Sequence, residues 1–233
     1  MKVSLIIPFK NEEDYAALTL QRVLSFFATH AINYEIIAVD DSTDATWDIL
    51  QRFESEHQHI FAVKGGTPSG YGKAIKKGFR AATGDILIPF NGDCSDSLED
   101  VIKFVALIER GNDMVFGSRY MRGASVTGAP ASKQLLSKVG NRFLQVLFQT
   151  SCSDLTNSFK AYKRNVIEDL TLTSNGYTIV IETALKSILK KHTYTTIPVS
   201  WSGREHGVSK MSILKAMVNY LVTAFKIRLG NYE

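Results

Sequence analysis

Short apolar runs alternate with amphipathic segments along the first 120 residues, and this alternation is the feature that most limits how the chain can fold. Runs that are continuously apolar and rich in β-branched residues are typical of strands buried on both faces. They predict strands over residues 3–7, 34–39, 60–63, 85–90 and 114–117. Apolar residues at helical spacing predict helices between them, including 70–82 and 98–108. Together these signals predict an α/β fold, with a mostly parallel sheet flanked by helices.

The pattern changes after Arg119. Residues 122–132 are rich in Gly, Ala, Ser and Pro and predict a mobile loop. Further helices are expected over 135–148, 177–189 and 212–229, and a further strand over 194–201. No internal repeat or low-complexity tract interrupts the chain, so we expect a single domain over residues 1–233.

The composition is that of an ordinary globular protein, with 45% apolar and 21% charged residues. The formal charge of +4 is mild, and it is compatible with attraction to phosphates or to an anionic membrane. The chain has no run of Arg and Lys like a nucleic-acid-binding arm, and its aromatic residues are not interleaved with basic ones. A nucleic-acid partner is therefore not expected.

Targeting and cysteine signals are weak. Cys94 and Cys152 match no metal-binding or redox spacing, so free thiols in a reducing cytoplasm are expected. The apolar start of the chain is too short for a signal peptide and predicts a first strand. Polar residues interrupt the apolar stretch 211–229, whereas a membrane span needs about 20 mostly apolar residues. No transmembrane helix is expected.

Polar or charged residues follow four of the predicted strands. They lie at 8–12, 40–41, 91–96 and 118–119. In open α/β sheets, ligands bind beyond the carboxyl ends of the strands, so these segments predict a binding crevice. The glycines at 70–74 lack the spacing of a phosphate loop, and no Gly-x-Gly-x-x-Gly follows the first strand, which disfavours P-loop and dinucleotide-binding proteins.

The turn Asn91-Gly92-Asp93 places two oxygen-bearing side chains two residues apart at the end of a strand. Carboxylate and carbonyl oxygens are the ligands that Mg²⁺ and Mn²⁺ prefer, so the turn is a candidate site for a divalent ion bound to a diphosphate. An ordinary Asn-Gly turn with a capping Asp would give the same pattern. Asp96 adds a third polar group, which could instead cap the next helix.

Two other sets of charges are candidates for ligand contacts. Asp40 and Asp41 can accept hydrogen bonds from a base or a ribose, or they can cap the following helix. Arg119, Arg204 and Lys210 can neutralise phosphate, although Arg204 and Lys210 lie in a loop where a cation can equally be solvated.

An ordered series of motifs covers nearly the whole chain. The motifs are Ser4-Leu-Ile-Ile-Pro8 with Asn11-Glu12-Glu13, Glu35-Ile-Ile-Ala-Val-Asp-Asp-Ser42, Gly70-Tyr-Gly-Lys-Ala74, Gly84-Asp-Ile-Leu with Asn91-Gly-Asp93, Phe116-Gly-Ser-Arg-Tyr120, Asp154-Leu-Thr-Asn-Ser-Phe-Lys160, and Arg204 with Ser209-Lys210-Met211. In this order they resemble family 2 glycosyltransferases, and within them the dolichyl- or polyprenyl-phosphate mannosyl- and glucosyltransferases.

The resemblance implies a GT-A fold, a Rossmann-like mixed sheet in which residues 1–120 bind the nucleotide sugar and 121–233 bind the acceptor. The residues it places around the nucleotide are Pro8, Lys10, Glu12, Asp40, Asp41 and Lys73. It assigns Asn91 and Asp93 to Mg²⁺ or Mn²⁺, and it assigns the phosphate-binding cations to Arg119, Arg204 and Lys210. Two departures stand out: Asn91 replaces the first carboxylate of the Asp-x-Asp motif, and Asn157-Ser158 replaces a glycine.

The resemblance further implies an inverting transfer of a hexose from a UDP- or GDP-sugar to a polyprenyl or dolichyl phosphate. A phosphate acceptor is already an anion and needs no strong base, whereas a sugar hydroxyl in a glycan would need a carboxylate such as Glu182 or Asp96. The same residues are also compatible with a nucleotide-sugar-binding protein without turnover and with a nucleotidyltransferase.

The helices at 135–148 and 212–229 are amphipathic and have basic flanks. Such helices can lie in the headgroup plane of a bilayer, so we expect a peripheral protein at the cytoplasmic face of a membrane. Both helices could instead simply pack on the sheet.

Overall fold

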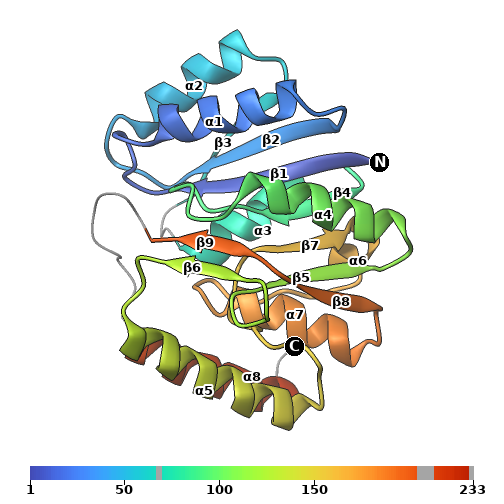
Figure 1. Cartoon of the computed structure of the whole chain (residues 1–233). Helices are drawn as coiled ribbons and strands as arrows, with labels where there is room; N and C mark the ends of the chain where they lie inside the picture. Colours follow the sequence, from blue (N-terminus) through green and yellow to red (C-terminus); the bar gives the residue numbers. More distant parts are fainter. Residues whose placement is uncertain (67–69, 204–212, 231–233) are drawn as a thin grey trace.

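The computed structural model describes residues 1–66, 70–203 and 213–230 (Figure 1). Its strands are β1 (Lys2–Phe9), β2 (Asn33–Asp40), β3 (Ile60–Lys64), β4 (Ile86–Pro89), β5 (Met114–Ser118), β6 (Ser125–Thr127), β7 (Lys160–Lys163), β8 (Tyr194–Pro198) and β9 (Ser200–Ser202). Its helices are α1 (Ala16–Ala28), α2 (Thr46–Glu56), α3 (Tyr71–Ala81), α4 (Leu98–Glu109), α5 (Ala131–Phe148), α6 (Arg164–Glu168), α7 (Ile179–Leu189) and α8 (Ile213–Arg228). Arg204 and Lys210, expected to bind phosphate, lie outside the described residues.

The main sheet has the strand order β3-β2-β1-β4-β7-β5-β8. Strands β3, β2, β1 and β4 are mutually parallel, and β8 is parallel to β5. Strand β7 runs antiparallel to both of its neighbours, β4 and β5. The predicted α/β fold, a mostly parallel mixed sheet flanked by helices, is confirmed.

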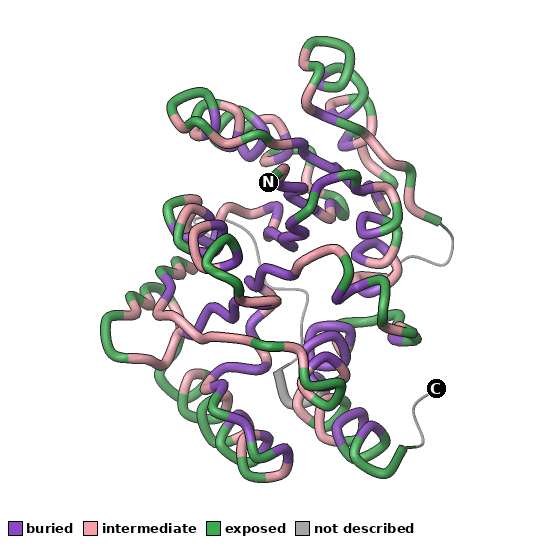
Figure 2. Tube along the Cα trace, turned by 90° about the vertical axis from the view of Figure 1, so that its right-hand side faces the viewer, coloured by how far each residue is buried: buried purple, intermediate pink, exposed green. Residues whose placement is uncertain are grey.

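The central strands are apolar on both faces because helices cover both sides of the sheet. In β1, Val3, Leu5 and Ile7 contribute to the core on one side, and Ile6 contributes to the core on the other; all four are fully buried. Helices α1, α2 and α4 cover the first face, and α3, α5, α7 and α8 cover the second (Figure 1). The buried strands run between helices whose outer surfaces are exposed (Figure 2).

Three expectations from the sequence need correction. Strand β7 was not expected, and it inserts the second half of the chain between two strands of the first half. Residues 122–132 are not simply a loop, because they contain β6 and the start of α5. The strand expected over 194–201 divides into β8 and β9, which belong to different sheets.

Strands β6 and β9 pair in a small parallel sheet beside the main one (Figure 1). An isolated bridge joins Trp201 of β9 to Asp96, which follows β4. Within the part of the chain that the structure describes, no helix is long and apolar enough to cross a membrane.

Candidate functional site

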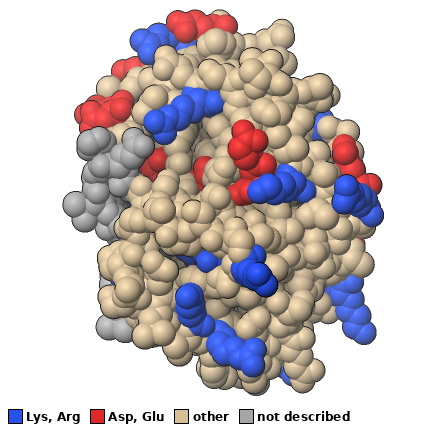
Figure 3. All heavy atoms as spheres, in the orientation of Figure 1, with Lys and Arg blue, Asp and Glu red and all other residues tan. Residues whose placement is uncertain are grey.

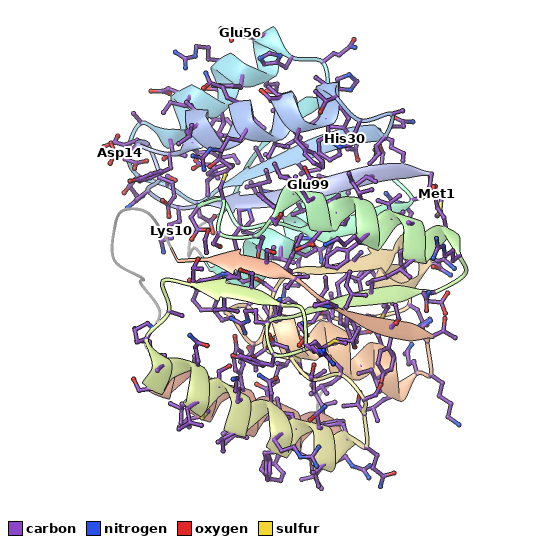
Figure 4. All side chains as sticks on the ribbon, viewed as in Figure 1. Met1, Lys10, Asp14, His30, Glu56 and Glu99 are labelled. Carbon is purple, nitrogen blue, oxygen red and sulfur yellow. The ribbon has the colours of Figure 1, made fainter. Side chains whose placement is uncertain are left out.

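The segments predicted to line a binding crevice lie at one edge of the main sheet. Strands β1, β2, β4 and β5 all end at this edge, and the antiparallel β7 begins there. Lys10 lies at this edge, at the opposite end of β1 from Met1 (Figure 4). The polar segments that follow these strands are thus brought together, as expected of a sheet of this type.

The loops after β1 and β2 hold each other. The backbone N–H of Asn11 donates to the Ser42 hydroxyl at 2.8 Å, and the N–H of Thr43 donates to Asn11 Oδ1 at 2.9 Å. Asn11 has a left-handed backbone with φ of 52°, a conformation that Asn tolerates better than most residues. These contacts position the segment that contains Pro8, Lys10 and Glu12 next to the end of β2.

Asp40 and Asp41 do not cap α2, so the capping role considered from the sequence is wrong. Asp40 is buried, accepts the N–H of Ser42 at 3.1 Å and forms an ion pair of 3.1 Å with Lys64. Helix α2 begins at Thr46 without a side-chain cap on its N-cap residue. The role of Asp40 seen here is to anchor the end of β2 to the end of β3.

Asp41 holds two glycines that follow β3 and precede α3. Its Oδ1 accepts the N–H of Gly66 at 3.1 Å, and its Oδ2 accepts the N–H of Gly70 at 3.0 Å. A Cβ at Gly65 would lie 1.7 Å from Asp41 Oδ1, so only glycine fits there. Lys73, also expected near the nucleotide, lies in the first turn of α3, immediately after this segment.

The candidate metal-binding turn follows β4. Asp93 Oδ1 accepts the N–H of Ser95 at 3.1 Å, and Cys94 between them has a left-handed backbone with φ of 53°. The side-chain amide of Asn91 donates to Asp96 Oδ2 at 2.8 Å. The turn therefore collects the oxygens of Asn91, Asp93 and Asp96, together with the Ser95 hydroxyl.

Asp96 is the most perturbed group of this turn. It is only 4% exposed, and its Oδ1 is buried without a hydrogen-bond partner among the described residues. Burial and the neighbouring Asp93 carboxylate raise the pKa of Asp96 to about 7, against the hydrogen bonds from Asn91. An orphaned buried carboxylate oxygen is costly unless a cation or a donor meets it.

This oxygen set fits a hard divalent cation. The described residues include no cluster of three or more His, Cys, Asp or Glu side chains, so the donors are two carboxylates supplemented by an amide and a hydroxyl. Mg²⁺ and Mn²⁺ accept such mixed oxygen ligands and retain water and phosphate oxygens as further ligands. The unsatisfied Asp96 Oδ1 is the observation that supports the fit.

Arg119 follows β5 and is held by Asp154. Its Nε contacts Asp154 Oδ2 at 2.8 Å, and its Nη2 contacts Oδ1 at 3.0 Å. The amide of Asn141 on α5 reaches the same carboxylate at 3.2 Å. Burial of the guanidinium lowers the pKa of Arg119, but the neighbouring Asp154 carboxylate has the larger effect, so the pKa is raised overall. Sequence reasoning did not identify Asp154 as this partner, although Asp154 begins one of the family motifs.

Glu182 does not lie in the crevice as a free carboxylate. It is fully buried on α7, and it accepts the backbone N–H groups of Thr173 at 2.8 Å and Ser174 at 2.7 Å. Burial raises its pKa, but these hydrogen bonds outweigh burial and leave the pKa below its usual value. The geometry is that of a residue that anchors the 173–174 segment.

Lys160 is a buried cation that sequence reasoning left without a role. Its Nζ donates to the carbonyl oxygens of Leu155 at 2.9 Å, Val180 at 3.3 Å and Asn157. Burial lowers its pKa to about 8. Lys160 thus ties the 154–158 segment, which contains the Arg119 partner, to α7.

Comparison with known proteins agrees with this architecture. The family model described as glycosyl transferase family 2 matches residues 4–171. A dolichol-phosphate mannosyltransferase of Pyrococcus furiosus is 30% identical over 232 residues, covering 97% of this chain and 64% of that protein. A polyprenol monophosphomannose synthase of Mycolicibacterium smegmatis is 29% identical over 218 residues, covering 89% of this chain and 80% of that protein. The chain thus spans just under two thirds of the Pyrococcus relative.

Among solved structures, glucosyl-3-phosphoglycerate synthase from Mycobacterium tuberculosis, in complex with Mn²⁺, UDP and glucosyl-3-phosphoglycerate, superposes with a TM-score of 0.74 at 17% identity. The superposition covers 100% of this chain and 81% of that one, and it shows the GT-A fold. The fold and the family model thus point to the same class of protein, the glycosyltransferases with a GT-A fold. The chain belongs to glycosyl transferase family 2.

Proposed function

We propose that this protein transfers a hexose from a UDP- or GDP-sugar to a polyprenyl phosphate, with inversion at the anomeric carbon. The observation that carries the proposal is the oxygen set of Asn91, Asp93 and Asp96 at the same sheet edge as the Arg119–Asp154 pair. Support comes from the family and from the relatives, whose names describe sugar transferases with dolichol, polyprenol or undecaprenyl phosphates.

At the donor end, Asp93 and Asn91 would hold Mg²⁺ or Mn²⁺, which neutralises the charge that develops on the leaving diphosphate. The nucleoside would lie against the interlocked loops after β1 and β2. The residues proposed there are Pro8, Lys10, Glu12, Asp40 and Asp41, with Lys73 toward the phosphates. Asp41 contributes mainly by holding Gly66 and Gly70 in place.

Arg119 would stabilise phosphate charge. A guanidinium has five N–H donors, and Asp154 engages Nε and Nη2 in a two-point contact that fixes its plane. A fixed cation needs no reorganisation when charge builds up, which is the main advantage of preorganised electrostatics. Arg204 and Lys210 are also proposed as phosphate ligands, on the basis of the sequence alone.

A lipid phosphate is the acceptor that fits these groups best. Such an anion needs no strong base, and Glu182 is already occupied by Thr173 and Ser174. Transfer to a sugar hydroxyl would need a proton acceptor, for which Asp96 is the remaining candidate.

A membrane-facing surface would bring the acceptor to the site. The exposed apolar residues of α5 recur at helical spacing, as do those at and just after α8. They are Leu135, Val139, Phe143 and Val146 on the first helix, and Val218, Val222, Phe225 and Leu229 on the second. Phe143 and Phe225 lie with ring centroids 5.8 Å apart, so the two stripes join in one surface, here called the α5–α8 face.

The charged residues on α5 and α8 are all basic. Neither helix contains Asp or Glu, whereas α5 carries Lys133, Lys138 and Arg142, and α8 ends with Lys226 and Arg228. In Figure 3 the part of the surface over α5 shows basic atoms and no acidic ones. Each basic residue near an anionic bilayer contributes about 1 kcal/mol, so we propose peripheral binding. Both cysteines are free thiols, which fits the reducing cytoplasmic face.

The test is incubation with UDP- and GDP-hexoses and Mn²⁺, with either polyprenyl phosphate or a soluble glycan. Formation of a glycosyl phospholipid with release of UDP or GDP supports the proposal. Glycan elongation without a lipid product would show that the acceptor is a sugar hydroxyl and not a lipid phosphate. Release of pyrophosphate would indicate a nucleotidyltransferase. Donor binding without any product would indicate a protein without turnover.

A further inference from the structure

The metal-binding turn lacks a carboxylate at its first position, because residue 91 is Asn. A neutral amide oxygen binds a divalent cation more weakly than a carboxylate does. The amide nitrogen of Asn91, Nδ2, donates to Asp96 Oδ2 at 2.8 Å. The hydrogen bond therefore holds a carboxyl group beside the position where the turn itself lacks one.

The other oxygen of Asp96 has no hydrogen-bond partner within the described part of the chain. Asp96 is 4% exposed and Oδ1 is fully buried, yet no donor of the described residues reaches it. Leaving a carboxylate oxygen buried and unsatisfied is unfavourable, and a cation or a hydrogen-bond donor at Oδ1 would remove that cost. Arg119, the cation that interacts electrostatically with Asp96, directs Nε and Nη2 to Asp154 instead.

The backbone around Asp96 is braced from outside the turn. Asp96 forms a β-bridge with Trp201 of β9. On either side, Ser202 donates its N–H to the Ser95 carbonyl at 2.9 Å, and Ser97 donates to the Ser200 carbonyl at 3.3 Å. These contacts hold the carboxylate in one place, and such support is what a ligand of a small cation requires.

We propose that Asp96 is a ligand of the divalent cation and supplies the carboxylate that Asn91 does not, while the Asn91 amide positions it. The inference rests on the proposed metal-dependent transfer and extends it. The second carboxylate, Asp96, lies five residues after Asn91 in the sequence. Asp93 is the first carboxylate, and Asn91 acts chiefly through its hydrogen bond to Asp96.

The experiment measures Mn²⁺ binding in the presence of UDP or GDP by calorimetry and by the electron paramagnetic resonance signal of free Mn²⁺. Asp96→Asn and Asp93→Asn are each expected to weaken Mn²⁺ binding by roughly tenfold or more. Glu99→Gln is the matched control, because Glu99 is an acid three residues away in the first turn of α4 and should leave the affinity unchanged. The charge-swapped variant Asn91→Asp/Asp96→Asn should recover most of the lost affinity, since one carboxylate and one amide again flank Asp93.

Wild-type affinity in Asp96→Asn, together with a loss in Asp93→Asn, would overturn the inference and leave the proposed function intact. No Mn²⁺ binding by the wild-type protein with either nucleotide would overturn both. If Asp96→Asn fails to fold, as judged by circular dichroism, the charge-swapped variant decides: its recovery of binding supports the inference, and its failure to bind while folded contradicts it.

Discussion

The guanidinium of Arg119 and the carboxylate of Asp154 meet through two contacts of 2.8 and 3.0 Å, although 35 residues separate them. The Asp154 side chain is fully buried and that of Arg119 is 21% exposed. Asp154 therefore serves mainly to fix the direction of the cation that follows β5.

Removing Asp154 should damage both stability and activity. Asp154→Ala leaves a largely buried guanidinium unpaired, which we expect to lower the free energy of unfolding by about 3–5 kcal/mol. Asp154→Asn keeps the shape and should cost less stability, but it should still reduce kcat because Arg119 is no longer held at two points. Urea denaturation and steady-state rates measure the two effects. Unchanged kcat in a folded Asp154→Asn variant would argue against a phosphate-binding role for Arg119.

Asp93→Ala should abolish turnover and leave the fold intact, because the half-buried side chain belongs to the turn rather than to the core. Sugar-transfer rates in Mn²⁺ and a thermal unfolding curve test this expectation. Wild-type rates would show that the turn is not the metal site.

Asn91→Asp alone would place a second negative charge against Asp96 and remove the donor that holds it. We therefore expect weaker metal binding, whereas the sequence motif alone suggests a gain. Titration of Mn²⁺ against this variant distinguishes the two expectations. Tighter Mn²⁺ binding would support the expectation from the sequence motif and contradict the one from the structure.

Asp41→Ala should weaken binding of UDP or GDP far more than it destabilises the protein. The hydrogen bonds lost are those to Gly66 and Gly70, and loss of a capping interaction of this kind costs only about 1 kcal/mol. Gly65→Ala should have the same effect on binding, because its Cβ would displace Asp41. Calorimetry with both nucleotides is the measurement, and unchanged affinity in both variants would reduce Asp41 to a structural role.

Glu35 should make the fold sensitive to acid. Burial opposes its charge, but hydrogen bonds from Lys2, Ser4 and Thr83 lower the pKa of Glu35 to about 2. A carboxyl whose pKa is lowered on folding stabilises the protein above its unfolded pKa, and this stability is lost as pH falls from about 4.5 toward 2. The shift corresponds to about 3 kcal/mol. Glu35→Gln should lower stability at pH 7 by a comparable amount and flatten the acid branch of a plot of unfolding free energy against pH.

The α5–α8 face should bind anionic vesicles. Val139→Glu and Phe225→Glu should each reduce co-sedimentation with phosphatidylglycerol vesicles at low salt, because each adds an acid to an apolar surface that has basic flanks. Phe61→Glu is the matched control, since Phe61 is similarly exposed on β3, on the opposite part of the sheet. Equal sedimentation of all three variants would exclude this face. Failure of the wild-type protein to sediment would favour a soluble acceptor.

Much of the architecture is readable from the sequence because it depends on local patterns. Buried parallel strands need continuous apolar runs, and β1, β2 and β5 have them. The polar segments that follow those strands predicted the crevice, since parallel strands must end at one edge. Strand β7 was missed because Lys-Ala-Tyr-Lys is short and polar, and only contacts with β4 and β5 make it a strand.

Tertiary structure decided which polar residues act together. The motifs pointed to Arg119 and Asp154 separately, but only the folding of β5 against β7 makes them a pair. Glu182 had the sequence features of a candidate base, yet the N–H groups of Thr173 and Ser174 engage it in the core. The sequence by itself thus determined the class of fold and the edge at which the candidate site lies, because both follow from local periodicity. The roles of single carboxylates depended on distant partners and on burial, which no local pattern encodes.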